Sequence, residues 1–545
     1  MRNRGWALVC VWWLVACGRV PRSLPLPTIT YPAQPQATST TSPTSTPPLP
    51  TLTLPTLPEP AHPTVVPLDK TDNQSDRAWQ MGLAHTGVWL YEDNSFIHPR
   101  ALEVMGEMAY LLDSGRVLRL NLAQPDPPET LLQAGAIIED VPVLEPFDLA
   151  SSGDILYVLD RAGDVYRYNT TTAVWQLDRY DRPVRDVSSQ YYVALTAQAD
   201  TRFLLETSYK FVQAYDDTGD RYAWLTGSAR EVDMSIAGEF AYVLTQLSEQ
   251  VGQVTKVEAA QRVQVEFVLG GALTRPRHIH ATPTTLYILD QAGYRLQAFD
   301  PATGERQNDW QFTQPISTFW ADETQLILTG RDTLYFVNQP ERMATLSGGL
   351  LLTSGQPHDV YTLTTLQGLF SPIANSIVAL REFQLPGAPR HYRLGVHEGM
   401  DFYKAIGTPV LAIADGTIIR ADTTYITPTE RLFGEMRDTV FIAGLTPPEA
   451  LDFYRGRQVW LQLDNGWVAR YAHLSEIPDG LEVGVRVMAG QTIGKVGNSG
   501  SPITQQNPEG DVHLHFELWL GNHYLGQFLH PIEVQEWLGI IFRRP

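Results

Sequence analysis

The chain has 545 residues, too many for one ordinary domain, so two or three domains are expected. It is acidic, with 40 Lys and Arg against 60 Asp and Glu residues, and no basic run is interleaved with aromatic side chains, which excludes nucleic acid as an expected partner. Its two cysteines, Cys10 and Cys17, both lie near the N-terminus, so a disulfide framework and a cysteine metal cluster are excluded. The 23 Tyr, 13 Trp and 41 Gly residues, with many short Val/Leu/Tyr runs, favour an all-β protein.

The N-terminal stretch MRNRGWALVCVWWLVAC carries two arginines and then an apolar run from Trp6 to Ala16. That run is too short for a bilayer core, which needs about 20 residues, and the layout is typical of an export signal. It ends in LVAC, residues 14–17, which resembles the lipobox of bacterial lipoproteins. The resemblance implies a signal peptide over residues 1–17, a lipid on Cys17, and an extracytoplasmic protein anchored to the cell membrane. An uncleaved short anchor and an unmodified secreted chain are the alternatives.

Residues 18–74 are rich in Pro, Thr and Ser. Fourteen of the 39 prolines fall between Pro21 and Pro67, and Glu59 is the only charged residue between Leu24 and Leu68. Such a composition cannot bury a core and favours extended polyproline II conformations. We therefore expect a disordered tether here.

Residues 75–345 contain a weak internal repeat, clearest at AYLLDSGRVLRLNL (109–122), ILYVLDRAGDVYRYN (155–169) and LYILDQAGYRLQAFD (286–300). Each unit has an apolar strand, an Asp, a glycine turn and an alternating strand, and the spacing of about 40 residues is that of four-stranded propeller blades. The repeat resembles β-propellers with NHL- or WD-like blades, which implies about six blades; an irregular pair of sandwiches is the alternative. His278 and His280 in this region lack ligand-spaced companions and are interpreted as structural. The sequence identifies no partner for the propeller.

A connector is expected over residues 346–389, followed by a final domain over 390–545. The final domain begins with YRLGVHEGMDFYKAIG, in which His397 and Asp401 are four residues apart. Nearby glycines disfavour a helix, and a straight strand would hold the two side chains about 13 Å apart. A bent loop through Gly399 would bring them together.

Two further motifs follow in this domain. VWLQLDNGWVARYAHL (459–474) has two alternating strands around an Asn-Gly turn, a strong hairpin signal, and His473 ends the second strand. DVHLHFELWL (511–520) places His513 and His515 on one face of a predicted strand and Leu514, Phe516 and Leu518 on the other. An isolated pair of this kind is compatible with an ordinary half-buried strand.

Taken in order, HEGMD, YAHL and HLHFEL resemble the motifs of the lysostaphin-type zinc endopeptidases, which cut peptidoglycan. The resemblance implies a barrel-like β-sheet domain over residues 390–545 that binds one zinc ion through His397, Asp401 and His515. It also implies that His473 and His513 are the catalytic pair beside the metal-bound water, and that the substrate is a peptidoglycan peptide. A catalytically inactive wall-binding or hydrolase-activating module is the main alternative, and an iron site with two His and one carboxylate is another.

The sequence departs from that family in two places. A long insertion, residues 422–457, separates ADGTII from VWLQLDNG, and twelve residues separate Gly500 from His513. We expect both segments to border the substrate groove. Because these two segments differ from the family, the resemblance does not identify which peptide bond is cut.

Overall fold

The computed structural model describes residues 65–67, 87–91, 98–123, 128–181, 190–227, 229–248, 250–312, 315–330, 333–338, 366, 368–374, 376 and 381–542. The predicted signal with Cys17 lies outside the described residues, as does the predicted tether except for residues 65–67. Most of the predicted connector is also outside them. In the part that is described, no helix has both the length and the apolar character needed to cross a membrane.

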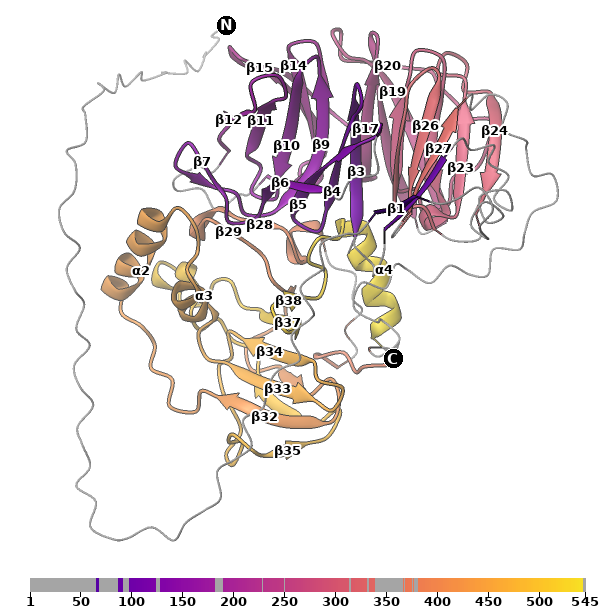
Figure 1. Cartoon of the computed structure of the whole chain (residues 1–545). Coiled ribbons are helices and arrows are strands. Elements are labelled where there is room, and N and C mark those ends of the chain that lie inside the picture. The colour runs from indigo at the N-terminus through magenta and orange to yellow at the C-terminus, as the bar shows by residue number, and fades with distance from the viewer. Residues whose placement is uncertain are drawn as a thin grey trace, which may run out of the picture. The chain divides into compact units, whose positions relative to one another are not determined.

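Six antiparallel sheets of four or five strands make up most of the described N-terminal half, and five of them contain four consecutive strands each (Figure 1). A short hairpin, β7 (Ile137–Ile138) with β8 (Val141–Pro142), lies between the first two in sequence. The first holds β3 (Pro99–Met105), β4 (Met108–Asp113), β5 (Arg116–Asn121) and β6 (Glu129–Gln133). The second holds β9 (Pro146–Ser152), β10 (Ile155–Asp160), β11 (Val165–Asn169) and β12 (Val174–Arg179). The third holds β13 (Tyr192–Gln198), β14 (Thr201–Glu206), β15 (Phe211–Asp216) and β16 (Gly219–Leu225). The fourth holds β17 (Arg230–Ala237), β18 (Phe240–Ser248), β19 (Val251–Glu258) and β20 (Val263–Val265), and the fifth β21 (His278–Ala281), β22 (Leu286–Asp290), β23 (Arg295–Phe299) and β24 (Arg306–Gln311).

The sixth sheet combines strands from both ends of this region. Its order is β1 (Val65–Pro67), β2 (Gly87–Tyr91), β27 (Thr333–Asn338), β26 (Gln325–Thr329) and β25 (Thr318–Ala321). One edge strand of each sheet contacts an edge strand of the next sheet, and these six strands form a closed ring: β3, β9, β13, β17, β21 and β25. The six-bladed propeller-like arrangement is therefore confirmed, and β1 lies within the stretch whose composition predicts a tether.

The repeated Asp has the same structural role in the three clearest units. Asp113, Asp160 and Asp290 each end the second strand of a blade and are buried. Each accepts a hydrogen bond of 2.7 Å from a backbone N–H that lies 15 or 16 residues earlier in the chain. The carboxylate thereby pairs a donor of the loop that enters the blade, which explains why the pattern recurs.

Another buried carboxylate, Asp148 of β9, lies on the innermost strand of its blade. Burial and the nearby charge of Asp233 on β17 raise its pKa to about 7. Arg100 on β3, the backbone N–H of Leu195 and His278 on β21 act in the opposite direction. Asp148 is therefore a group whose protonation is favoured by folding.

A seven-stranded antiparallel sheet forms the centre of the C-terminal domain. Its order is β30 (Met400–Phe402), β37 (Leu514–Leu520), β34 (Val468–Ala472), β33 (Val459–Leu463), β32 (Gly416–Ala421) and β35 (Arg486–Val487), with β38 (His523–Tyr524) paired to β37. Two short pairs flank it: β28 (Pro389–Arg390) with β29 (Gly395–Val396), and β31 (Pro409–Leu411) with β36 (Thr492–Lys495). Leu366, Leu369, Ile373 and Leu385, from the predicted connector, belong to the same hydrophobic core as this sheet.

The insertion folds into two helices, α2 (Glu430–Ala443) and α3 (Pro448–Arg455). Phe433 and Val440 of α2 pack with Ala450 and Tyr454 of α3 in a small separate core. Each helix starts with a recognisable signal, because the Thr429 side chain caps α2 and Pro448 is the first residue of α3. The insertion is therefore a folded helical hairpin.

The last helix, α4 (Pro531–Ile541), packs on both halves of the chain. Trp537 and Leu538 belong to the core of the C-terminal domain, whereas Ile532 packs in a cluster with residues of β18, β21 and β22. Arg277 of the propeller donates a 2.5 Å hydrogen bond to Glu536 of the same helix. Because buried side chains join the two halves here, the full chain is the appropriate unit for experiments.

Candidate active site

His397 and Asp401 come together because the chain bends between β29 and β30, as the glycines of this stretch predict. His397 Nε2 lies 2.9 Å from Asp401 Oδ1. A Cβ on Gly399 would lie 2.4 Å from the backbone oxygen of Phe516, so any side chain here would force the bend and β37 to move apart. Glycine at this position therefore lets the bend pack directly against the strand that carries His515.

His515 is brought to the same place by strand pairing. Asp401 of β30 and His515 of β37 are direct cross-strand partners in the antiparallel ladder, so their side chains lie on one face of the sheet. Leu514, Phe516 and Leu518 point to the other face and are fully buried. The predicted alternation along this strand is confirmed.

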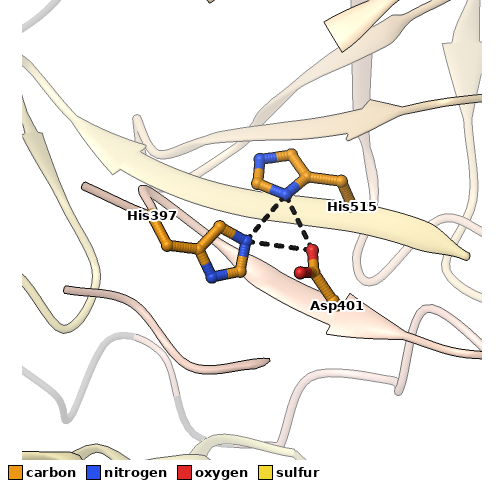
Figure 2. A group of neighbouring side chains, drawn as sticks. All are labelled: His397, Asp401 and His515. Carbon is orange, nitrogen blue, oxygen red and sulfur yellow. Dashed lines mark hydrogen bonds and ion pairs between the residues drawn. The ribbon is translucent and has the colours of Figure 1, made fainter. Parts of the chain in front are cut away.

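Three potential ligand atoms therefore form a nearly equilateral triangle (Figure 2). His397 Nε2, His515 Nδ1 and Asp401 Oδ1 are separated by 2.9, 3.0 and 3.0 Å. Two ligands of a tetrahedral zinc ion would be about 3.3 Å apart, so the triangle is close to the size that zinc needs. The residues are 2%, 6% and 5% exposed, and together they form a group able to hold a metal ion.

The electrostatics of the triangle favour a cation. Burial, with the Arg390 charge, lowers the pKa of His397 to about 3, which keeps this imidazole neutral as a ligand must be. Burial disfavours a charge on His515 as well, but the hydrogen bonds that the imidazole donates to Asp401 and Glu517, together with the charges of these carboxylates, outweigh it and raise the pKa of His515 to about 9. The carboxylates thus favour positive charge on the His515 imidazole, and a metal ion bound at Nδ1 would take the place of the proton on that nitrogen.

Each ligand is also oriented by an outer contact. The Nδ1–H of His397 donates to the Leu385 carbonyl at 2.9 Å, and the Nε2–H of His515 donates to Glu517 Oε1 at 2.8 Å. These hydrogen bonds leave Nε2 of His397 and Nδ1 of His515 for the metal. Arg390 donates to Asp401 Oδ2 at 2.9 Å, which leaves Oδ1 facing the triangle.

His473 and His513 lie beside the triangle, with their ring centres 4.6 Å apart. The Nδ1–H of His473 donates to the Ser499 carbonyl at 2.7 Å, and that of His513 donates to the Asp511 carbonyl at 2.8 Å. Nε2 is therefore the nitrogen that each ring has left for substrate or water, and His513 Nε2 lies 3.6 Å from Asp401 Oδ1. Burial and the neighbouring His513 lower the pKa of His473 to about 3.

The backbone of His473 is unusual. Its φ is 58°, a left-handed conformation that few residues other than glycine adopt. The residue follows the last residue of β34, so this conformation turns the imidazole out of the strand direction at the end of the hairpin. Strained backbone conformations of this kind are concentrated at functional sites.

The five histidine and aspartate side chains line a cavity of about 470 Å³. The insertion contributes Leu451, Tyr454 and Arg455 to its wall, and the segment before His513 contributes Ser501, Pro502, Ile503 and Asp511. Both departures from the family pattern therefore border the cavity, as expected. The propeller contributes Tyr191, Ser208 and Tyr209.

The structure adds residues that the sequence reading missed. Glu517 is two residues after His515 on the same strand face, a spacing that could have indicated its contact with the imidazole. Tyr403 stacks on His513, with ring centres 5.0 Å apart. Arg390 and Arg455 are brought to the site only by the folding of separate segments, and no local sequence pattern predicts their contacts.

Comparison with known proteins agrees with this geometry. Residues 395–526 match the family model "Peptidase family M23", so the chain has a C-terminal M23 peptidase domain. A comparison with curated proteins gave no match. Among solved structures, the chain is similar to the computationally designed Ika8 protein (11% identity, 44% of this chain and 70% of that chain, TM-score 0.32) and to U3-55K (12% identity, 42% and 74%, TM-score 0.32). TM-scores this low do not indicate a shared fold or function, so nothing is inferred from either structure.

Proposed function

We propose that this protein is a lipid-anchored, extracytoplasmic zinc metalloendopeptidase that hydrolyses peptide bonds in the cross-links of peptidoglycan. The observation that carries the proposal is the triangle of His397, Asp401 and His515 with two more imidazoles beside it in one cavity. The match to a metallopeptidase family over residues 395–526 supports the reaction class.

The donor set fits zinc. Two imidazole nitrogens and one carboxylate oxygen would hold one ion and leave a fourth tetrahedral position, which is the pattern of catalytic zinc sites. When bound, zinc lowers the pKa of a coordinated water towards about 7 and polarises the carbonyl of the bond that is cut.

His473 and His513 supply the proton chemistry. Their Nε2 atoms are oriented by the backbone contacts of Nδ1, so one ring can take the proton of the attacking water and pass it to the leaving amine. The other can donate a hydrogen bond to the oxygen on which negative charge develops. A catalytically inactive module is disfavoured because all five of these side chains are present in the sequence and line one cavity.

The substrate and the location rest on the sequence. The ordered motifs resemble those of enzymes that cut peptidoglycan, and LVAC at residues 14–17 resembles a lipidation signal. A lipid on Cys17 followed by a Pro/Thr-rich tether would keep the enzyme at the membrane while its site reaches the cell wall. His473 and His513, the two histidines beside the triangle, favour zinc over iron because an iron oxygenase site would not need them.

The proposal is tested by incubating the full chain with purified peptidoglycan and identifying the released muropeptides by mass spectrometry. We expect fragments with newly formed amino and carboxyl ends, which a zinc chelator suppresses and added Zn²⁺ restores. Absence of such fragments with zinc-loaded protein, or release that is insensitive to chelation, would refute it.

A further inference from the structure

A fully buried carboxylate, Glu517, joins the metal ligand His515 to the insertion. We propose that Arg455, the last residue of α3, is a positioning residue for the metal site and acts on His515 through Glu517. The inference rests on the metal site of the proposed function and gives the insertion a role beyond bordering the cavity.

The contacts form a continuous chain of hydrogen bonds. The Nε2–H of His515 donates to Glu517 Oε1 at 2.8 Å. Arg455 donates to the same carboxylate with both Nε and Nη2, at 2.7 and 2.9 Å. The side chain of Arg455 is 7% exposed and that of Glu517 0%, so water cannot replace either partner.

Paired guanidinium–carboxylate hydrogen bonds fix the plane of a carboxylate as well as its charge. The Oε1 atom that Arg455 holds is also the atom that orients the His515 ring, so a rotation of this carboxylate would turn the ring away from the triangle. A second cation, Arg470, has its Nη1 atom 3.6 Å from Glu517 Oε2. The indole N–H of Trp519 donates a hydrogen bond of 2.5 Å to the same Oε2 atom. Neither of them contacts Oε1 as a hydrogen-bond donor.

The turn that follows Arg455 is also tied to His473. The backbone N–H of His473 donates to the Arg455 carbonyl at 2.9 Å. A Cβ on Gly456 would lie 2.2 Å from the Ser499 carbonyl oxygen, the atom that accepts the His473 Nδ1–H. Two consecutive residues at the end of the insertion, Arg455 and Gly456, therefore contact the groups that orient His515 and His473.

The test uses the full chain and titration with Co²⁺, whose visible absorption reports the ligand geometry, together with Zn²⁺ competition for affinity. We expect Arg455→Gln to weaken metal binding by about 10- to 100-fold, as loss of an outer partner typically does, and to change the cobalt spectrum. Arg455→Lys keeps the charge but not the paired hydrogen bonds, so it should restore the affinity only in part.

Arg420→Gln is the matched control, because Arg420 also pairs with carboxylates at the base of the insertion, Asp422 and Asp452, and contacts no site residue. It should bind Co²⁺ as the wild type does. The inference is overturned if Arg455→Gln retains wild-type affinity and spectrum, or if the control loses as much. Should Arg455→Gln not fold, wild-type binding by Arg455→Lys would also overturn it. Failure of the wild-type chain itself to bind metal would refute the proposed function instead.

Discussion

Replacing Gly399 by Ala tests whether close packing of the bend against β37 builds the metal site. A Cβ at this position would lie 2.4 Å from the Phe516 oxygen, 2.8 Å from Glu517 Cγ and 3.0 Å from His515 Cε1. Real Cβ contacts essentially never fall below 3.0 Å, so the bend and β37 must separate by at least about 0.6 Å. A site must be held to within about 0.5 Å to keep its productive geometry.

We therefore expect Gly399→Ala to cost about 1–3 kcal/mol of stability, as overpacking typically does, and to weaken zinc binding by about tenfold or more. Competition with a chromophoric chelator measures the affinity, and thermal unfolding measures the stability. Gly434→Ala is the control, because Gly434 lies in α2 and an added Cβ would have nothing within 4 Å except the neighbouring residues and the backbone of its own helix. It should stabilise the helix by about 0.5–1 kcal/mol and leave zinc binding unchanged. Wild-type zinc affinity in Gly399→Ala would show that the close packing of the bend against β37 does not build the metal site.

Three further predictions concern the catalytic pair, the propeller and the membrane anchor. His473→Ala and His513→Ala should each keep zinc but lose about 10²- to 10⁴-fold in muropeptide release, and near-wild-type turnover would remove that residue from the mechanism. Asp148 has a higher pKa in the folded than in the unfolded chain, so the folded state holds this proton more tightly. Between about pH 4 and pH 7, each unit of rising pH should therefore lower the free energy of unfolding of the wild type, relative to that of Asp148→Asn, by at most about 1.4 kcal/mol. A difference between the two proteins in denaturant unfolding that does not change with pH would contradict this. Cys17→Ala should abolish partitioning into a detergent phase, and unchanged partitioning together with an unchanged mature mass would contradict lipidation.

Much of the site could be predicted because its signals are local. The spacing of His513 and His515 indicates a shared strand face, and the glycines around His397 and Asp401 exclude a regular helix. The Asn-Gly turn likewise predicted the hairpin that ends at His473, with Gly466 at φ 91°. The blade repeat predicted the number of sheets because each blade repeats the same strand and turn chemistry.

The remaining features depend on contacts between distant segments. The sixth blade needs β2, which carries β1 at its edge, to pair with β27, more than two hundred residues later, and no local pattern specifies such a closure. Arg455 reaches Glu517 across 62 residues of sequence, and Arg390 reaches Asp401 from a separate strand. Charged side chains of this kind look like ordinary surface residues until the fold buries them.

Metal analysis of the purified full chain shows whether the triangle of His397, Asp401 and His515 holds zinc. The wild type should contain one zinc ion per chain, and His397→Ala, Asp401→Ala and His515→Ala should each lose it while remaining folded. Iron in place of zinc, or full zinc occupancy in all three folded variants, would contradict the assignment of this triangle as a catalytic zinc site.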